Sequence, residues 1–292
     1  MKSRWFVNLA LLAVIAGLGI FLWLAPKKEE AAPDAIKVSS IAPSAVNKIE
    51  IGFPAKNPVV FEKQDGHWRL VQPYSARADG ESVGKLLDVL NADSVDKFDA
   101  ADPARYGLDQ PALRLKLDDR EMLFGTTNPV NGRQYIAFEN AVYLVATRFY
   151  DVAGTQVVEM LDKHLIAPGE EVVGFDFSHL EQWEETGLVI ERDGANWKVS
   201  IPTAKPTPGE LDGWFGDGWK TLRANAVEPY KPDPRQSYPY FEIILKDGKR
   251  IHVDKQLESP ELVLARPDEG MAYHYAADLG FTLLNPPVGV PK

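Results

Sequence analysis

The stretch Gly80–Leu86 comes closest to a reactive motif, because glycines beside a lysine are typical of loops that bind phosphate groups. Such a loop requires four residues between its glycines and a serine or threonine after the lysine, which binds magnesium. Here three residues separate Gly80 from Gly84, and Leu86 stands at the metal-binding position. Val83 and Leu86 instead fit the apolar spacing of a helix, so the stretch predicts a helix start rather than a nucleotide site.

Other side chains that could do chemistry are scattered along the chain. The chain has no cysteine, which excludes disulfides, thiolate metal sites and cysteine nucleophiles. No two histidines have the spacing of a metal-binding helix; they are His67, His164, His179, His252 and His274. Several aspartates lie in turn-like surroundings, where this residue is common; they are Asp99, Asp102, Asp109, Asp118 and Asp119. The sequence therefore predicts no catalytic residue, no metal site and no cofactor.

The charge of the chain bears on its partners. There are 32 basic and 42 acidic residues, a net charge of −10. Without Lys2 and Arg4, the remainder has 30 basic against 42 acidic residues, or −12. Binding to nucleic acid depends largely on neutralising phosphates, so this balance excludes nucleic acid as a partner.

The first 25 residues predict a membrane anchor. Residues 1–4 are a short basic lead, and residues 5–25 are uncharged with Asn8 as the one polar side chain. At about 1.5 Å per residue, a helix of this length spans a bilayer core of about 30 Å. A cleaved signal peptide is the alternative, but its apolar region is shorter, and Trp23 and Leu24 stand where cleavage needs small residues. Because so short a lead more readily stays in the cytoplasm, we expect a single-pass protein of the bacterial inner membrane with its body in the periplasm.

An internal repeat dominates the remainder, after a Pro-, Ala-, Lys- and Glu-rich linker at residues 26–45. Residues 59–73 align without a gap with residues 188–202, at an offset of 129. Trp68 matches Trp197, and we interpret both as core anchors between sheet and helix. Helical and alternating apolar patterns then follow in the same order in each half.

These patterns predict an α+β fold: two tandem repeats of a mainly antiparallel sheet, each with one packed helix, after the transmembrane helix. Each repeat should contain two strands, a helix, four strands and a short helical closure. The predicted boundaries are residues 46–160 for the first repeat, 161–171 for a connector, 172–285 for a diverged second repeat, and 286–292 for a tail.

Five residues are candidates for a ligand or partner surface. Asn128, Asn131 and Arg133 lie in a polar loop whose counterpart in the second repeat differs in sequence. Trp183 and Trp214 are large aromatic residues of the kind that bind sugars or partner proteins.

The assembled motifs resemble a bacterial envelope family, domain of unknown function 4340. The matching residues are Asp65-Gly66-His67-Trp68-Arg69-Leu70, Pro73, Ala78-Asp79, Tyr106-Gly107-Leu108-Asp109-Gln110-Pro111, Phe124-Gly125, Tyr135 and Val142-Tyr143. Residues 46–150 contain nearly all of them. In the second repeat, Ser237-Tyr238-Pro239 replaces one motif and Val253 aligns with Gly125. The resemblance implies an envelope-facing, single-pass protein that occurs beside ABC transporters of the gliding-motility type, and it implies no catalytic residues.

The leading hypothesis is therefore a non-enzymatic periplasmic accessory protein that binds subunits of an ABC transporter complex. The first alternative is a protein that binds an envelope polysaccharide or another ligand in a cleft between the repeats. The second alternative is a hydrolase with an unrecognised pair of carboxylates.

Overall fold

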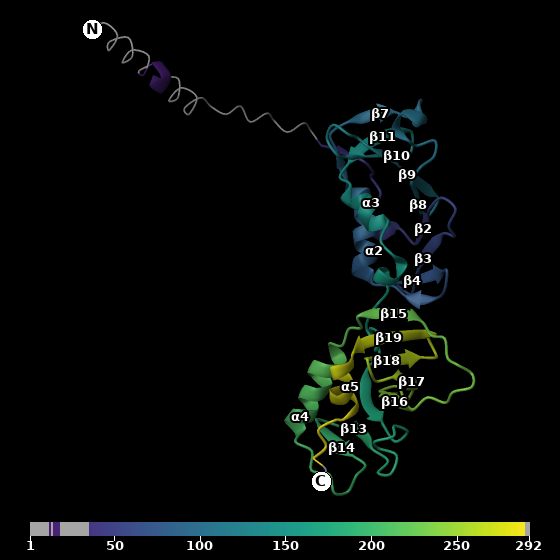
Figure 1. Cartoon of the computed structure of the whole chain (residues 1–292), viewed down its shortest axis with the longest axis vertical. Helices are drawn as coiled ribbons and strands as arrows, with labels where there is room; N and C mark the ends of the chain where they lie inside the picture. Colours follow the sequence, from purple (N-terminus) through teal and green to yellow (C-terminus); the bar gives the residue numbers. More distant parts are fainter. Residues whose placement is uncertain (1–11, 13, 18–34, 290–292) are drawn as a thin grey trace. The chain divides into compact units, whose positions relative to one another are not determined.

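The computed structural model describes residues 12, 14–17 and 35–289 (Figure 1). The chain divides into two units, residues 1–36 and 37–292. In the first unit, residues 14–17 are helical, and the side chains of Leu12, Val14 and Ile15 are exposed by 71%, 61% and 64%. Within the described part of the chain, no helix is long and apolar enough to cross a membrane. Most of the anchor expected at residues 5–25 lies outside the described residues, so it stays a prediction.

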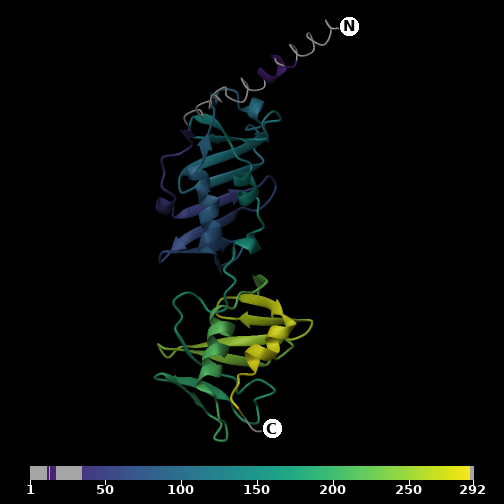
Figure 2. The same ribbon diagram turned by 90° about the vertical axis from the view of Figure 1, so that its left-hand side faces the viewer.

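The second unit begins with a sheet whose strands are all paired antiparallel. Its strands are β2 (Lys48–Gly52), β3 (Val59–Gln64), β4 (His67–Gln72), β5 (Ala76–Arg77), β7 (Lys97–Asp99), β8 (Leu113–Leu117), β9 (Arg120–Thr127), β10 (Gln134–Phe138) and β11 (Ala141–Val145). They lie in the order β5-β4-β3-β2-β8-β9-β10-β11-β7. Helices α2 (Gly80–Leu87) and α3 (Arg148–Ala153) cover one face (Figures 1 and 2). The short strands β1 (Ile36–Lys37) and β6 (Asp93–Ser94) form a separate pair.

The following residues form a second antiparallel sheet. Its strands are β12 (Val172–Asp176), β13 (Val189–Asp193), β14 (Asn196–Val199), β15 (Ala226–Pro229), β16 (Tyr240–Leu245), β17 (Arg250–Leu257), β18 (Glu261–Arg266) and β19 (Met271–Ala276). Their order is β14-β13-β12-β16-β17-β18-β19-β15. Its helical elements are α4 (Pro208–Gly213), the π-helix η5 (Trp214–Lys220) and α5 (Ala277–Leu284).

The two sheets share one strand order. When β5 is left out, the third strand along the chain (β4 or β14) lies at one end of each sheet, and the fourth (β7 or β15) lies at the other end. The first strand (β2 or β12) lies inside its sheet. The first sheet adds only β5. A helix follows the third strand in the second sheet and the added strand β5 in the first. The predicted α+β class with mainly antiparallel sheets is confirmed, whereas the boundaries predicted between the repeats stay predictions.

The sequence pattern predicts six strands in each repeat, so it missed three strands of the first sheet (β2, β5 and β7) and two of the second (β12 and β15). Strand β5 has only two residues. β2 and β12 pair on both sides and lie inside their sheets, while β7 and β15 form an edge. β2 directly follows the linker, and β12 follows the connector, so neither stood within a longer apolar pattern. β7 and β15 have three and four residues, too few to show an alternation.

The helical segment around Trp214 differs from a regular α-helix. The chain turns from α4 into a π-helix at Trp214. Trp214 and Trp219 are five residues apart, so an α-helix would point them about 140° apart. The wider π-helical turn brings both toward the sheet. Both indoles are buried, with their ring centroids 6.2 Å apart.

The matched tryptophans occupy equivalent sites. Trp68 and Trp197 are buried, at 9% and 7% exposure, which confirms their interpretation as core anchors. Each faces a cation on the neighbouring strand. The Nζ of Lys63 lies 5.1 Å from the ring of Trp68, and the guanidinium of Arg192 lies 4.2 Å from the ring of Trp197.

The sequence alignment matches Gly125 with Val253, but the two residues face opposite sides of their sheets, so this match is wrong. Phe124 faces α3, where its ring lies 6.1 Å from that of Tyr150, so Gly125 faces away. Val253 pairs with Phe241, whose ring contacts Trp219 on the helical side. The turn from β8 to β9 contains two residues, but Leu245 bonds Lys249 across three residues at the next hairpin. This extra residue reverses the face, because side chains alternate along a strand.

Candidate functional site: a charged junction

The connector at residues 161–171 forms backbone hydrogen bonds to both sheets. The amide of Asp162 donates to the carbonyl of Arg77 in β5 at 3.0 Å. Ala224, just before β15, donates to the carbonyl of Lys163 at 2.8 Å. The connector is therefore held between the two sheets rather than being a free linker.

Arg77 is the centre of this junction. Its side chain is only 11% exposed, and its guanidinium donates to the Asp162 carboxylate and the His164 carbonyl. It also donates to the Tyr273 hydroxyl of β19 at 2.9 Å, and its Nε lies 3.0 Å from the Glu269 carboxylate. Tyr273 in turn donates to Glu269 at 2.7 Å. One arginine of the first sheet thus contacts the connector and the second sheet.

Arg266 extends this network at the end of β18. Its side chain is 2% exposed and forms a two-pronged pair with Glu170 of the connector, at 2.8 and 2.9 Å. It also donates to Asp268 at 2.8 Å and to the Leu165 carbonyl at 2.8 Å. Its Nη1 lies 3.5 Å from Glu269, which both arginines therefore share.

The charges of the network stabilise one another. Burial opposes the charge on Arg266, but the hydrogen bonds that it donates to Asp268 and Glu170, together with the nearby Glu269, outweigh burial and raise its pKa. Burial also opposes the charge on Arg77, while Tyr273, Glu269 and Asp162 raise its pKa. Burial raises the pKa of the Tyr273 and Tyr275 hydroxyls as well. Both arginines consequently stay charged across the biological pH range.

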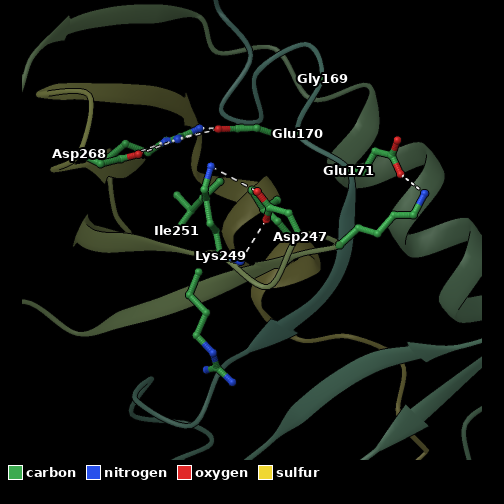
Figure 3. A pocket seen from close by; sticks show the side chains of 11 residues that line it. Gly169, Glu170, Glu171, Asp247, Lys249, Ile251 and Asp268 are labelled. Carbon is green, nitrogen blue, oxygen red and sulfur yellow. Dashed lines mark hydrogen bonds and ion pairs between the residues drawn. The ribbon is translucent and has the colours of Figure 1, made fainter.

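A cavity of about 630 Å³ opens beside Arg266 (Figure 3). Its cations are paired: Lys246 with Glu171 at 2.5 Å, Lys249 with Asp247 at 3.3 Å, and Arg250 with Asp176 and Glu242 at 2.9 and 2.6 Å. The other residues that line the cavity are Gly169, Glu170, Leu245, Ile251, Arg266 and Asp268. Because acids and bases balance there, the cavity has no surplus charge to attract an ion.

A smaller cavity, of about 230 Å³, lies between the repeats. It is lined by Trp68 and Asp79 of the first repeat, by Asp162 and His164 of the connector, and by Arg223. This volume is below the range of roughly 300–1,000 Å³ that is typical of small-molecule sites.

Three of the predicted surface residues stabilise one turn. The Asn128 amide donates to the Tyr135 hydroxyl at 2.9 Å, and its backbone amide bonds the Arg133 carbonyl at 2.7 Å. The Asn131 side chain accepts from the Arg133 amide at 3.0 Å. These contacts close the hairpin between β9 and β10, whose tip at Val130 is 92% exposed.

The other two predicted residues anchor α5. The indoles of Trp183 and Trp214 donate to the carbonyls of Leu284 and Thr282, at 2.9 and 3.0 Å. Trp214 is 8% exposed, which does not fit a residue of a partner surface. The five candidates therefore belong to two separate places rather than one surface.

The glycine-rich motif at residues 80–86 has a structural role. Gly80–Leu86 begins α2, with the Asp79 carboxylate accepting from the Glu81 amide at 2.9 Å, so the predicted helix start is confirmed. Across residues 35–289 and the few described before them, no group of three or more acidic, histidine or cysteine side chains could hold a metal ion. The sequence reading missed Arg77 and Arg266, because an arginine in a strand pattern normally indicates an exposed face.

Comparison with known proteins identifies one family. The sequence model of one protein family, described as Domain of unknown function (DUF4340), matches residues 68–231, which is more than half of the chain. The match extends well beyond residues 46–150, where the resemblance was placed, and includes Arg77 and the whole connector. No curated protein and no solved structure matches the chain.

Proposed function

The chain belongs to the DUF4340 family, and from this premise we propose that it is a non-enzymatic interaction module of the bacterial envelope. In this proposal, residues 5–25 anchor it in the inner membrane and the two-sheet body lies in the periplasm. The exposed apolar side chains of Leu12, Val14 and Ile15 support the anchor, since such residues are stabilised in lipid.

The observation that carries this proposal is the arginine network of the junction. Arg77 and Arg266 together contact Asp162, Glu170 and Glu269 while they are almost fully buried. Removing one partner from a buried ion pair typically costs about 3–5 kcal/mol, so the network strongly resists separation of the sheets. It fixes the surfaces of the two sheets relative to each other, as an accessory protein requires. Its acids are occupied by arginines, so none is free as a general base.

The chemistry of the chain also suits a particular partner. A body with a charge of −12 should prefer a partner with a basic face, and this attraction should weaken with salt. The linker at residues 26–45 keeps the body close to the membrane, which raises its effective concentration near membrane proteins. We propose the subunits of an ABC transporter complex as this partner.

A pull-down from membranes tests the proposal. The full-length protein and a form without residues 1–25 are compared at low and high salt. We expect transporter subunits to be recovered with the full-length protein and to be reduced at high salt. If nothing were recovered with either form while the body cleaved a wall or glycan substrate, the hydrolase alternative would replace this proposal.

The alternative of a ligand cleft between the repeats has less support. The cavity there measures about 230 Å³, and Arg223 already lies 3.7 Å from Asp79 within it.

A further inference from the structure

A second kind of site lies on the first sheet, away from the junction. A cavity of about 480 Å³ opens where β2 ends and β8 begins. One wall is Phe53 and Pro54, which follow β2, and the other is the segment Asp109–Ala112, which precedes β8. Arg114 of β8 completes it, opposite Gly52 in the sheet register.

The fold itself explains only part of the segment at residues 106–111. Tyr106, Leu108 and Pro111 are buried, and Gly107 has a φ of +68° that suits glycine. Asp109 and Gln110, in contrast, are exposed. Among the described residues, neither side chain forms a hydrogen bond or an ion pair. The buried members of the segment thus present two unused polar groups at the rim of the cavity.

The third polar group is only loosely held. The guanidinium of Arg114 lies 3.4 Å from Glu121, and both side chains are about half exposed. An exposed pair of this geometry contributes little to stability, so Arg114 can exchange Glu121 for a ligand at low cost. Phe53 is half-buried, with the Nζ of Lys56 5.5 Å from its ring centroid.

These groups together select one class of ligand. A carboxylate accepts hydrogen bonds, a guanidinium donates them, and an amide does both, which matches hydroxyls that must donate and accept at once. Asp109 disfavours an anion, Arg114 disfavours a cation, and a purely apolar ligand would leave both without partners at a cost. Phe53, in one wall of the cavity, supplies an aromatic ring of the kind that packs against the C–H face of a sugar. We propose that this cavity binds a neutral saccharide, independently of the protein partner proposed above.

The size of the cavity sets the extent of the ligand. Its volume falls in the lower part of the range for small-molecule sites, which suits a short piece of a chain rather than a folded partner. The cavity is open to solvent at Asp109 and Gln110, so a longer glycan could extend past it.

Isothermal titration calorimetry tests this site. The full-length protein, in a detergent without a sugar headgroup, is titrated with maltohexaose and with tetra-N-acetylchitotetraose. We expect saturable binding of at least one of them. Asp109→Asn should weaken it about tenfold or more, because hydrogen bonds to a charged group are among the strongest. Phe53→Ala should weaken it to a similar degree.

Asp119→Asn is the matched control. Asp119 lies on the hairpin after β8 and is 89% exposed, so this change should leave binding unaltered. Asp109→Asn keeps the size of an exposed side chain, and circular dichroism should show an unchanged melting midpoint. Absence of binding to both saccharides, or binding by Asp109→Asn as tight as by the unmodified protein, would overturn the proposal.

Discussion

Two equivalent segments contact their sheets in different ways. The segment from β7 to β8 lies close to the first sheet because glycines leave room for its backbone, whereas the segment from β15 to β16 is bonded to the second sheet by a tyrosine hydroxyl. In the first sheet, a Cβ on Gly125 would lie 2.1 Å from the carbonyl oxygen of Tyr106, so only glycine permits this approach. In the second sheet, Tyr230 donates to the carboxylate of Asp254 at 2.5 Å.

The sheet faces that lie away from the helices are consequently covered by different residues. In the first sheet, Tyr106, Leu108 and Val142 form a small buried cluster on the face away from the helices. In the second sheet, Val263, Ala265 and Ala272 form the cluster, with Tyr230 packed against it. One strand order is therefore compatible with two ways of covering a sheet: close backbone contact or a side-chain hydrogen bond. In the first sheet, the side chains of Asp109 and Gln110 are left without a partner among the described residues. In the second sheet, the polar groups of Tyr230 and Asp254 bond each other.

The largest effect is expected where the repeats agree. Trp68→Ala and Trp197→Ala should each lower the free energy of unfolding by about 3–5 kcal/mol, because each empties a large aromatic core site. Chemical denaturation followed by far-ultraviolet circular dichroism measures this without relying on indole fluorescence. An unchanged midpoint for either variant would mean that its tryptophan is a binding residue and that the two sites are not equivalent.

The junction offers the next test, because it joins the two sheets. Arg77→Ala should lower the free energy of unfolding by about 3 kcal/mol, since it removes the buried cation that pairs with both Asp162 and Glu269. It should also split the unfolding curve into two transitions, one for each sheet.

Arg235→Ala is the control for this change. Arg235 is 88% exposed and, among the residues that the structure describes, pairs only with Asp233, so its loss should have almost no effect. A single, unshifted transition for Arg77→Ala would show that the junction does not couple the sheets.

The close approach of Gly125 to the backbone of Tyr106 can be tested directly. Gly125→Ala should destabilise the protein by about 2–3 kcal/mol, because the added methyl group meets the backbone of Tyr106. Gly84→Ala is the matched control: its Cβ would meet nothing within 4 Å, and alanine should stabilise α2 by about 0.5–1 kcal/mol. Thermal unfolding of both variants measures the opposite signs. Equal shifts would contradict the close approach.

The tyrosine contact is the counterpart in the second sheet. Tyr230→Phe removes one hydrogen bond to a carboxylate but keeps the ring, so we expect a loss of about 1.5 kcal/mol. Hydrogen exchange should become faster in the segment 230–239 and stay unchanged at residues 103–112. Faster exchange in both segments would mean that the two covers are not independent.

The sequence predicted what depends on local pattern. The alternation of Leu113, Leu115 and Leu117 and the matched Trp68 and Trp197 are properties of single segments, and the structure confirms the strands and the buried sites that they indicated. The strand β2 and the junction depend on partners far along the chain. Arg77 lies 192 residues from Glu269, and no pattern around either residue indicates a buried ion pair.

The hairpins show the same limit at the scale of one residue. The turns after β8 and β16 both contain acidic and polar residues, but they differ in length by one residue. A difference of one residue then reversed the face on which Val253 lies. The candidate surface residues stay a prediction: Asn128 and Asn131 were selected for their polarity, and the contacts that the structure gives them lie within their own turn.

The smallest effect is a pH dependence specific to the second sheet. Asp176 lies at the end of β12. Burial raises the pKa of its carboxyl, but hydrogen bonds from Ser178 and Arg250 outweigh this, so the folded pKa is lower than the usual value of an aspartate. A lowered folded pKa means that the ionised carboxylate stabilises the fold above the unfolded pKa. This contribution is lost as the pH falls below about 4 and through the folded value.

Asp176→Asn should therefore lower the free energy of unfolding at pH 6 and have less effect at pH 3, which is below the unfolded pKa of about 3.9, so that part of the stabilisation by the carboxylate is already lost. Denaturation curves at the two pH values measure the difference. The ion pairs of Arg250 with Asp176 and Glu242 lie on β12, β16 and β17, so hydrogen exchange at low pH should quicken in these strands before it quickens in β2, β8 and β9. If both sheets lost protection together at low pH, or if Asp176→Asn destabilised the protein equally at both pH values, the acid response would not arise from this carboxylate.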